Sequence, residues 1–187
     1  KALDEYNSKT GYDIPIHVDA ASGGFILPFL APGKKWDFRL KWVYSISTSG
    51  HKYGLVYPGL GWVVWKDRKY LPAEMAFSVN YLGADITQVG LNFSRPAAQI
   101  LAQYYNFIRL GVEGYREVHS NSMAIAEYCH KMIGSMKCFE NYSQNLDNPL
   151  FIWTMNSEYD KTAKWTLFDP QDKLMQRGWM VPAYTMP

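Results

Sequence analysis

Short apolar runs separated by loops of small and polar residues fill the first third of the chain. Residues 14–19 (IPIHVD) form an apolar, β-branched run that is typical of a buried parallel strand. Further strands are predicted at 42–47 (WVYSIS) and 61–66 (GWVVWK), and a helix is predicted to stop near Gly11. The first two strands run into Gly- and Ser-rich loops, which is how open α/β sheets present ligand sites.

The pattern changes to a helical period from Ser94 onward. Ser94 is predicted to cap a helix, with Pro96 near its start, where the missing N–H is harmless. Apolar residues then recur at helical spacing to about Gly111. A second helical pattern covers residues 115–134.

The rhythm breaks again after the second helix. Residues 148–156 (NPLFIWTMN) predict a strand, and residues 169–178 predict a short helix that Gly178 stops. Residues 179–183 (WMVPA) predict the start of another strand. We therefore expect the last third of the chain to open a separate α+β unit.

Composition excludes several classes of protein. Hydrophobic residues make up 48% of the chain and charged residues 19%, as in soluble globular proteins. The net charge of +2, with no cluster of basic residues, predicts no nucleic-acid or membrane partner. Cys129 and Cys138 have no His or Cys at metal-ligand spacing, so we expect no metal site and a reducing, cytoplasmic compartment. With no initiator Met or signal peptide and an abrupt end, the chain is expected to be a fragment.

Lys52 is the first candidate for chemistry. It follows the second predicted strand, inside SISTSGHKYG, where no other fixed charge occurs for several residues. A lysine that forms an imine must be neutral part of the time, and a sheltered position favours this. From this segment alone, a surface lysine that caps a turn is an equally good interpretation.

Asp19 is a chemical partner for such a lysine. It ends the predicted strand IHVD, and the following AASGGF offers it no cation. An acid at the end of a core strand is costly unless it meets a cation or a hydrogen-bond donor. A protonated pyridine nitrogen is such a partner, and an Asp in this role keeps the ring an electron sink. The alternative is an N-cap or loop acid.

The residues directly before Lys52 predict a phosphate site. Hydroxyls and amides of the segment 47–50 (STSG) could surround a phosphate, and His51 adds a further donor. The small residues at 21–22 leave room for a flat ring against the strand end. A Ser-rich turn alone is weak evidence, and its position before Lys52 strengthens it.

Five segments are long and specific: HVDAASGGF, WDFRL, SISTSGHKYG, GWVVW and NFSRPAAQILAQYYNFIRLGVEGY. Together they resemble the glutamate decarboxylases of bacteria and plants, which are fold-type I, group II pyridoxal-phosphate decarboxylases. The likeness runs from about Asp4 to Pro187. It implies an α/β fold, with residues 1–122 as the C-terminal part of a cofactor-binding large domain with a mostly parallel sheet. Residues 123–187 would begin a small α+β C-terminal domain.

The resemblance implies roles for the residues at matching positions. Lys52 would hold pyridoxal 5′-phosphate as a Schiff base, and Asp19 would pair with the ring nitrogen. Ala21 would pack near the ring, while Ser49 and His51 would bind the phosphate.

Three further positions match between residues 81 and 94. Phe93 and Ser94 would be offered to the active site of a neighbouring subunit, Ser94 to its cofactor phosphate. Tyr81, in the NYLGAD segment, would lie in a mobile catalytic loop and donate a proton.

The implied reaction is decarboxylation of L-glutamate to 4-aminobutanoate and CO2, in a homo-oligomer of at least two subunits with shared sites. Half of the family's active site would lie outside this chain, so the isolated chain is expected to be inactive. One alternative is another group II enzyme, such as a tyrosine or aspartate decarboxylase or a sphingosine-phosphate lyase. Another is an inert assembly core whose aromatic helix serves a subunit interface. SGHKYG, WDFRL and the NFSRPAAQ helix start favour glutamate decarboxylase.

Overall fold

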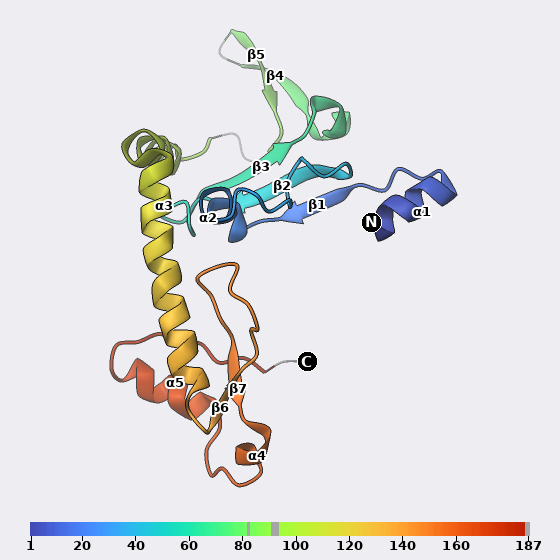
Figure 1. Ribbon diagram of the computed structural model, residues 1–187. Coiled ribbons are helices and arrows are strands. Elements are labelled where there is room, and N and C mark those ends of the chain that lie inside the picture. The colour runs from blue at the N-terminus through green and yellow to red at the C-terminus, as the bar shows by residue number, and fades with distance from the viewer. Residues whose placement is uncertain (82, 91–93, 186–187) are drawn as a thin grey trace. The chain divides into compact units, whose positions relative to one another are not determined.

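The computed structural model describes residues 1–81, 83–90 and 94–185 (Figure 1). These residues form two compact units, Lys1–His119 and Ser120–Pro187, and helix α3 (Ala98–Gly134) crosses the boundary between them. The domain division expected between residues 122 and 123 stays a prediction.

The first unit is built on a three-stranded sheet in the order β1–β2–β3. Strand β1 (Ile16–Asp19) pairs in parallel with β2 (Val43–Ser49), and β3 (Gly61–Trp65) returns antiparallel to β2. The α/β class is as predicted, but the expected mostly parallel sheet is met by the first pair alone. Residues 50–60 connect β2 to β3 without the helical crossover that a parallel pair needs.

A small apolar core lies against this sheet. Ala20, Val43 and Ile46 are buried, and four half-buried residues pack against them. Those four are Ile16, Val18, Trp36 and Phe38. The predicted strand β1 is parallel but only partly buried in this chain, because Ile16 and Val18 are half-buried while His17 and Asp19 are exposed.

Two short helices precede β2. Helix α1 (Ala2–Thr10) ends at Gly11, which has a φ of 75°, so the predicted stop is confirmed. A 3-10 turn (Gly23–Phe25) leads into α2 (Leu27–Leu30), which was not predicted and carries a proline in its first turn.

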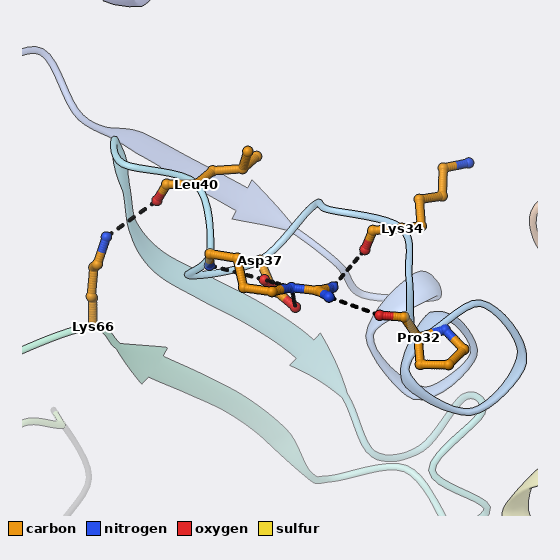
Figure 2. A network of polar contacts seen from close by, with 6 residues as sticks. Pro32, Lys34, Asp37, Leu40 and Lys66 are labelled. Carbon is orange, nitrogen blue, oxygen red and sulfur yellow. Dashed lines mark hydrogen bonds and ion pairs between the residues drawn. The ribbon is translucent and has the colours of Figure 1, made fainter.

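Arg39 organises the loop between α2 and β2 (Figure 2). Its Nε donates to Asp37 Oδ1 over 2.8 Å, and this hydrogen bond lowers the pKa of the Asp37 carboxyl. Its two terminal nitrogens donate to backbone carbonyls over 2.8 Å and 2.6 Å, and Lys66 Nζ donates to a third carbonyl over 3.2 Å. These carbonyls belong to Pro32, Lys34 and Leu40 respectively. The WDFRL segment is thereby joined to the end of β3.

Residues 77–88 form a separate β-hairpin. Strand β4 (Phe77–Tyr81) pairs antiparallel with β5 (Ala84–Gln88). Figure 1 shows this hairpin standing off from the β1–β3 sheet. The prediction that Tyr81 lies in a loop is wrong, since Tyr81 ends β4 and its backbone pairs with Ala84. Two short 3-10 turns, Arg68–Tyr70 and Ala73–Met75, precede it.

Helix α3 is interrupted where the sequence predicts a break. Gly111 has a φ of 58° and a ψ of −163°, which is a glycine conformation and not a helical one. The predicted cap at Ser94 is wrong, because the helix begins at Ala98. Pro96 disfavours helical geometry in the residue before it, which delays the helix start.

The second unit pairs β6 (Phe139–Asn141) antiparallel with β7 (Trp153–Met155), which is shorter than the predicted strand. Helix α4 (Ser157–Asp160) and helix α5 (Phe168–Met175) follow. Gly178, with a φ of 83°, lies after α5 as predicted. The strand predicted at 179–183 is wrong, since these residues have no regular structure. In the part of the chain described, no helix is long and apolar enough to cross a membrane.

Candidate active site

A chain of polar side chains runs from β1 to β2. The Ser47 hydroxyl donates to Asp19 Oδ1 over 3.4 Å, and its oxygen lies 3.3 Å from His17 Nε2. His17 Nδ1 lies 2.7 Å from Ser45 Oγ. The four residues share a face because Asp19 is the register partner of Ser47, and His17 that of Ser45. In neutral His17, Nε2–H donates to Ser47 while the Ser45 hydroxyl donates to Nδ1.

The Asp19 carboxylate is held at one oxygen and open at the other. Oδ1 also accepts the N–H of Ala21 over 3.0 Å. No residue in the described ranges donates to Oδ2, and the side chain is exposed in this chain. This geometry leaves Oδ2 able to accept a hydrogen bond from a protonated ring nitrogen.

Lys52 lies in the loop after β2, beside the loop that follows β1. The N–H of Lys52 donates to the Ser49 carbonyl over 3.3 Å, and the N–H of Ser49 donates to the Ala21 carbonyl over 3.2 Å. The carboxyl ends of two parallel neighbours therefore bring Lys52 and Asp19 to one edge of the sheet. The sequence predicts shelter for Lys52, but in this chain its side chain is exposed.

His51 is oriented by the backbone at the start of β3. Its Nδ1 lies 3.0 Å from the Leu60 carbonyl oxygen, which can only accept, so Nδ1 carries a proton. Nε2 is therefore the ring nitrogen that is left to contact a ligand. A neutral His51 could accept but not donate through Nε2, so donation to a phosphate requires the imidazolium form.

The other predicted site residues are not brought to this edge by the described contacts. Ser94 is exposed and precedes α3, and Phe93 lies outside the described residues. Tyr81 belongs to the separate β4–β5 sheet.

Sequence reasoning missed four side chains of α3 that contact the loop after Lys52. Their hydrogen bonds reach the backbone of residues 53–55. These side chains are Gln103, Asn106, Tyr115 and His119. The available signal is the polar type of residues 103 and 106, at helical spacing within an otherwise apolar and aromatic segment.

His119 is the most unusual of these groups. Its side chain is 1% exposed, and burial lowers the pKa of its imidazole, while the hydrogen bond to the Tyr53 backbone opposes this in part. Its ring packs against Phe29 and Tyr115, with ring centres 5.9 Å and 5.7 Å away. His119 is therefore a neutral core residue that binds the loop after Lys52.

Residues 2–150 match the family described as the pyridoxal-dependent decarboxylase conserved domain. The chain belongs to this family. Pyridoxal phosphate is the cofactor of the family, as the sequence resemblance implies.

Comparison with individual proteins shows which members of the family the chain resembles. Glutamate decarboxylase beta of Listeria innocua is 52% identical over 185 residues, covering 99% of this chain and 39% of that protein. The solved glutamate decarboxylase of Lactobacillus brevis matches with a TM-score of 0.91 and 46% identity, over 100% of this chain and 42% of that one. The sphingosine-1-phosphate lyase of Burkholderia pseudomallei matches with a TM-score of 0.76 and 25% identity, over 100% and 41%. The chain thus spans about 39–42% of the length of these proteins.

These likenesses confirm the predicted resemblance and the α/β, fold-type I class of the family. The residues present also fit the cofactor. The open oxygen of Asp19 suits a protonated ring nitrogen, and the nearby strand end supplies the Lys52 amine. Gly24 packs closely on Thr48, and an added Cβ would collide with the Thr48 side chain. This packing keeps the loop after β1 close to the end of β2.

Proposed function

We propose that the full-length protein carrying this chain decarboxylates L-glutamate to 4-aminobutanoate and CO2, with pyridoxal phosphate attached to Lys52. One observation carries the proposal. An exposed carboxylate ends β1, and a lysine lies in the loop after its parallel neighbour β2, in a chain 52% identical to a glutamate decarboxylase. Because the chain spans about 39% of that relative, the activity is proposed for the longer protein.

Five residues of the sheet edge would hold the cofactor. Asp19 Oδ2 would accept the ring nitrogen proton, and Ala21 would pack beside the ring. Ser49 and His51 would bind the phosphate, His51 through Nε2 because Nδ1 is held by the Leu60 carbonyl. Lys52 would hold the aldehyde carbon.

The chemistry divides between the cofactor and these side chains. When bound, the cofactor takes up the electrons that the departing CO2 leaves behind. Asp19 holds a proton at the ring nitrogen, and Ser47 and the Ala21 N–H keep its carboxylate in place. Lys52 would bind the cofactor between turnovers, and Lys52 or Tyr81 would supply a proton to the α-carbon of the substrate.

We propose that the protein is a homo-oligomer of at least two subunits with shared sites. Phe93 and Ser94 would reach the active site of the neighbouring subunit, Ser94 its cofactor phosphate. Large apolar side chains exposed on the first half of α3 support a subunit interface. They include Leu101, Tyr104, Tyr105 and Ile108, which are 62–68% exposed in this chain. A molar mass above that of one subunit in light scattering tests this proposal.

The chain carries two free cysteines, Cys129 and Cys138. This supports a reducing compartment, and we propose the cytoplasm.

Absorbance and mass spectrometry of the purified full-length protein test the attachment. We expect a visible absorbance band that borohydride abolishes, together with a reduced cofactor mapped by peptide mass to Lys52. Release of CO2 from glutamate, tyrosine and aspartate then separates the substrates, and glutamate is expected to react fastest. A protein with no reducible band would favour the inert assembly core. A preference for tyrosine or aspartate, or turnover of a phosphorylated long-chain base, would favour another group II enzyme.

A further inference from the structure

The carbonyl of Gly54, two residues after Lys52, is held by two buried side chains of α3. Gln103 Nε2 donates to Gly54 O over 2.9 Å, and the Tyr115 hydroxyl donates to the same oxygen over 2.9 Å. The second proton of Gln103 Nε2 goes to the Tyr115 oxygen over 2.8 Å. Each donor in this triangle has an acceptor, and both lone pairs of the Gly54 oxygen are used. Gln103 is 0% exposed, so water does not compete for these bonds.

The residues on either side of Gly54 are bound by α3 as well. Asn106 Nδ2 donates to the Leu55 carbonyl over 2.8 Å, and His119 hydrogen-bonds the backbone of Tyr53. The α3 cradle consists of Gln103, Asn106, Tyr115 and His119. It binds three consecutive residues that directly follow Lys52.

The cradle exists because α3 is broken at Gly111. Gln103 and Tyr115 are twelve residues apart, which in a straight helix is about 18 Å along the axis, too far for their side chains to meet. The non-helical geometry of Gly111 turns the two arms of α3 toward the same loop. Figure 1 shows the two arms running in different directions.

The cradle meets the lysine loop at a strained turn. Leu55 has a φ of 63°, a left-handed conformation that costs a non-glycine residue of order 1–3 kcal/mol. The N–H of Leu55 donates to the Lys52 carbonyl over 3.3 Å, and the N–H of Lys52 donates to the Ser49 carbonyl over 3.3 Å. Two successive turns thus fix both peptide groups that flank the Lys52 side chain, and α3 stabilises the second turn.

Gln103 is an expensive residue for a buried position. Its Oε1 is buried without a hydrogen-bond partner among the described residues, a loss of roughly 1–3 kcal/mol. Turning the amide over would place Oε1 against Gly54 O, another acceptor, so its orientation is determined. Gly50 and Gly54 make room for it, since a Cβ on either would lie 2.6 Å from Oε1. An apolar side chain would avoid the cost of burying Oε1, but it would not donate to the Gly54 carbonyl. The role of Gln103 at this position is therefore to supply its amide donors.

We propose that the α3 cradle positions Lys52 and that Gln103 is its central positioning residue. The inference rests on the proposed function, in which Lys52 attaches the cofactor. The two peptide groups beside Lys52 fix the direction of its Cα–Cβ bond, and so they limit the region that its flexible, exposed side chain can reach. A held amine meets a bound aldehyde in the reactive direction more often than a mobile one. Gln103 touches neither cofactor nor substrate and acts through the loop.

The test compares two glutamine variants in the full-length protein. Gln103→Met removes both amide donors at similar volume. After the cofactor is removed and pyridoxal phosphate is added back, we expect the absorbance of the Lys52-attached cofactor to return about tenfold more slowly. We expect kcat to fall by a similar factor and the KM for glutamate to stay within about twofold. Gln99→Met is the matched control, because Gln99 lies on the same arm but binds the Pro58 carbonyl, outside the cradle, over 3.2 Å.

The rate of cofactor attachment and kcat decide the outcome, and the thermal midpoint of each variant shows whether it folds. Wild-type attachment and kcat in Gln103→Met overturn the proposal. Equal losses in Gln103→Met and Gln99→Met also overturn it, because they assign the effect to general stability. If Gln103→Met does not fold, Asn106→Ala replaces it, since Asn106 is partly exposed and its loss leaves the core intact. We expect about threefold slower attachment there, and a wild-type rate overturns the proposal.

Lys52→Ala separates this proposal from the proposed function. A reducible chromophore that persists in Lys52→Ala contradicts the proposed function itself. If the chromophore is lost in Lys52→Ala while the cradle variants attach the cofactor at the wild-type rate, positioning alone fails.

Discussion

Gln103 and Tyr115 meet across a break in one helix. Gln103 Nε2 donates to the Tyr115 hydroxyl over 2.8 Å, although Gly111 lies between them and departs from helical geometry. The contact joins both arms of α3 to the loop that carries Lys52. The geometry of a single glycine therefore bears on the proposed attachment of the cofactor.

Gly111→Ala is expected to lower the free energy of unfolding by about 1–3 kcal/mol, because a Cβ is strained at this backbone conformation. The space around Gly111 is open, so the effect comes from the backbone and not from a collision. Chemical denaturation of the full-length protein measures it. Gly11→Ala is the control: Gly11 is also open but lies in the ordinary left-handed region, where alanine costs roughly 1–2 kcal/mol. A smaller loss at Gly111 than at Gly11 would contradict the prediction.

Asp19→Asn is expected to lower kcat by at least about 100-fold, because an amide does not hold a proton at the ring nitrogen. Cofactor affinity should change less than kcat, because the Asn side chain has the shape of Asp and keeps one hydrogen-bond acceptor. Steady-state kinetics and cofactor titration separate the two effects. Ser47→Ala is the matched control, as it removes the 3.4 Å hydrogen bond to the same carboxylate but keeps the charge. A kcat for the Asn variant within about twofold of wild type would refute the role of Asp19.

Two replacements of His51 distinguish its two ring nitrogens. Gln places an amide nitrogen where Nε2 lies, and Asn places one where Nδ1 meets the Leu60 carbonyl. If Nε2 binds the phosphate, His51→Asn should raise the Kd for pyridoxal phosphate about tenfold or more. His51→Gln should raise it less, and should lose about 1 kcal/mol of stability with the Leu60 contact. The reverse order of Kd values, measured by titration of the cofactor-free protein, would contradict the assignment.

His119 predicts a pH dependence of stability. Burial lowers the pKa of His119 in the folded state, so below about pH 6.5 the unfolded chain binds the proton that the folded chain refuses. The free energy of unfolding should therefore fall as pH drops below about 6.5, by at most about 1.4 kcal/mol per pH unit. The fall should end once the pH has passed below the lowered pKa of folded His119.

His119→Phe is the variant that isolates this contribution. At about pH 8 two effects on the free energy of unfolding oppose each other: the variant loses the hydrogen bond to the Tyr53 backbone, but it no longer buries His119 Nε2, which has no partner among the described residues. From about pH 8 to about pH 5 the stability of wild type relative to the variant should fall, because Phe does not titrate. Thermal midpoints across this range give the comparison, and a difference that stays constant with pH would show that His119 does not titrate on unfolding.

Several elements were predictable because their causes are local. Gly11 ends α1 and Gly111 breaks α3, both at positive φ, and a sequence pattern shows such residues directly. The placement of Asp19 at the end of β1 and of Lys52 after β2 was also predictable, because apolar runs followed by small polar residues mark strand ends.

Other features depend on partners far away in the chain. The antiparallel return of β3 and the pairing of Tyr81 with Ala84 follow from hydrogen bonds that a short window of sequence does not reveal. The start of α3 was mispredicted for a local reason. Ser94 is a good capping residue, but Pro96, two positions later, delays the helix to Ala98.

The sequence by itself determined the candidate chemistry, because Lys52 and Asp19 are identified by residue type, by a position after a strand, and by the family segments around them. Only the tertiary structure decided how the Lys52 loop is held. Gln103, Asn106, Tyr115 and His119 read as parts of helical patterns, and they converge on residues 53–55 only after Gly111 redirects the helix. Residues far apart in the chain can form hydrogen bonds only when the fold brings them close together. Here the packing of α3 against residues 53–55 does so.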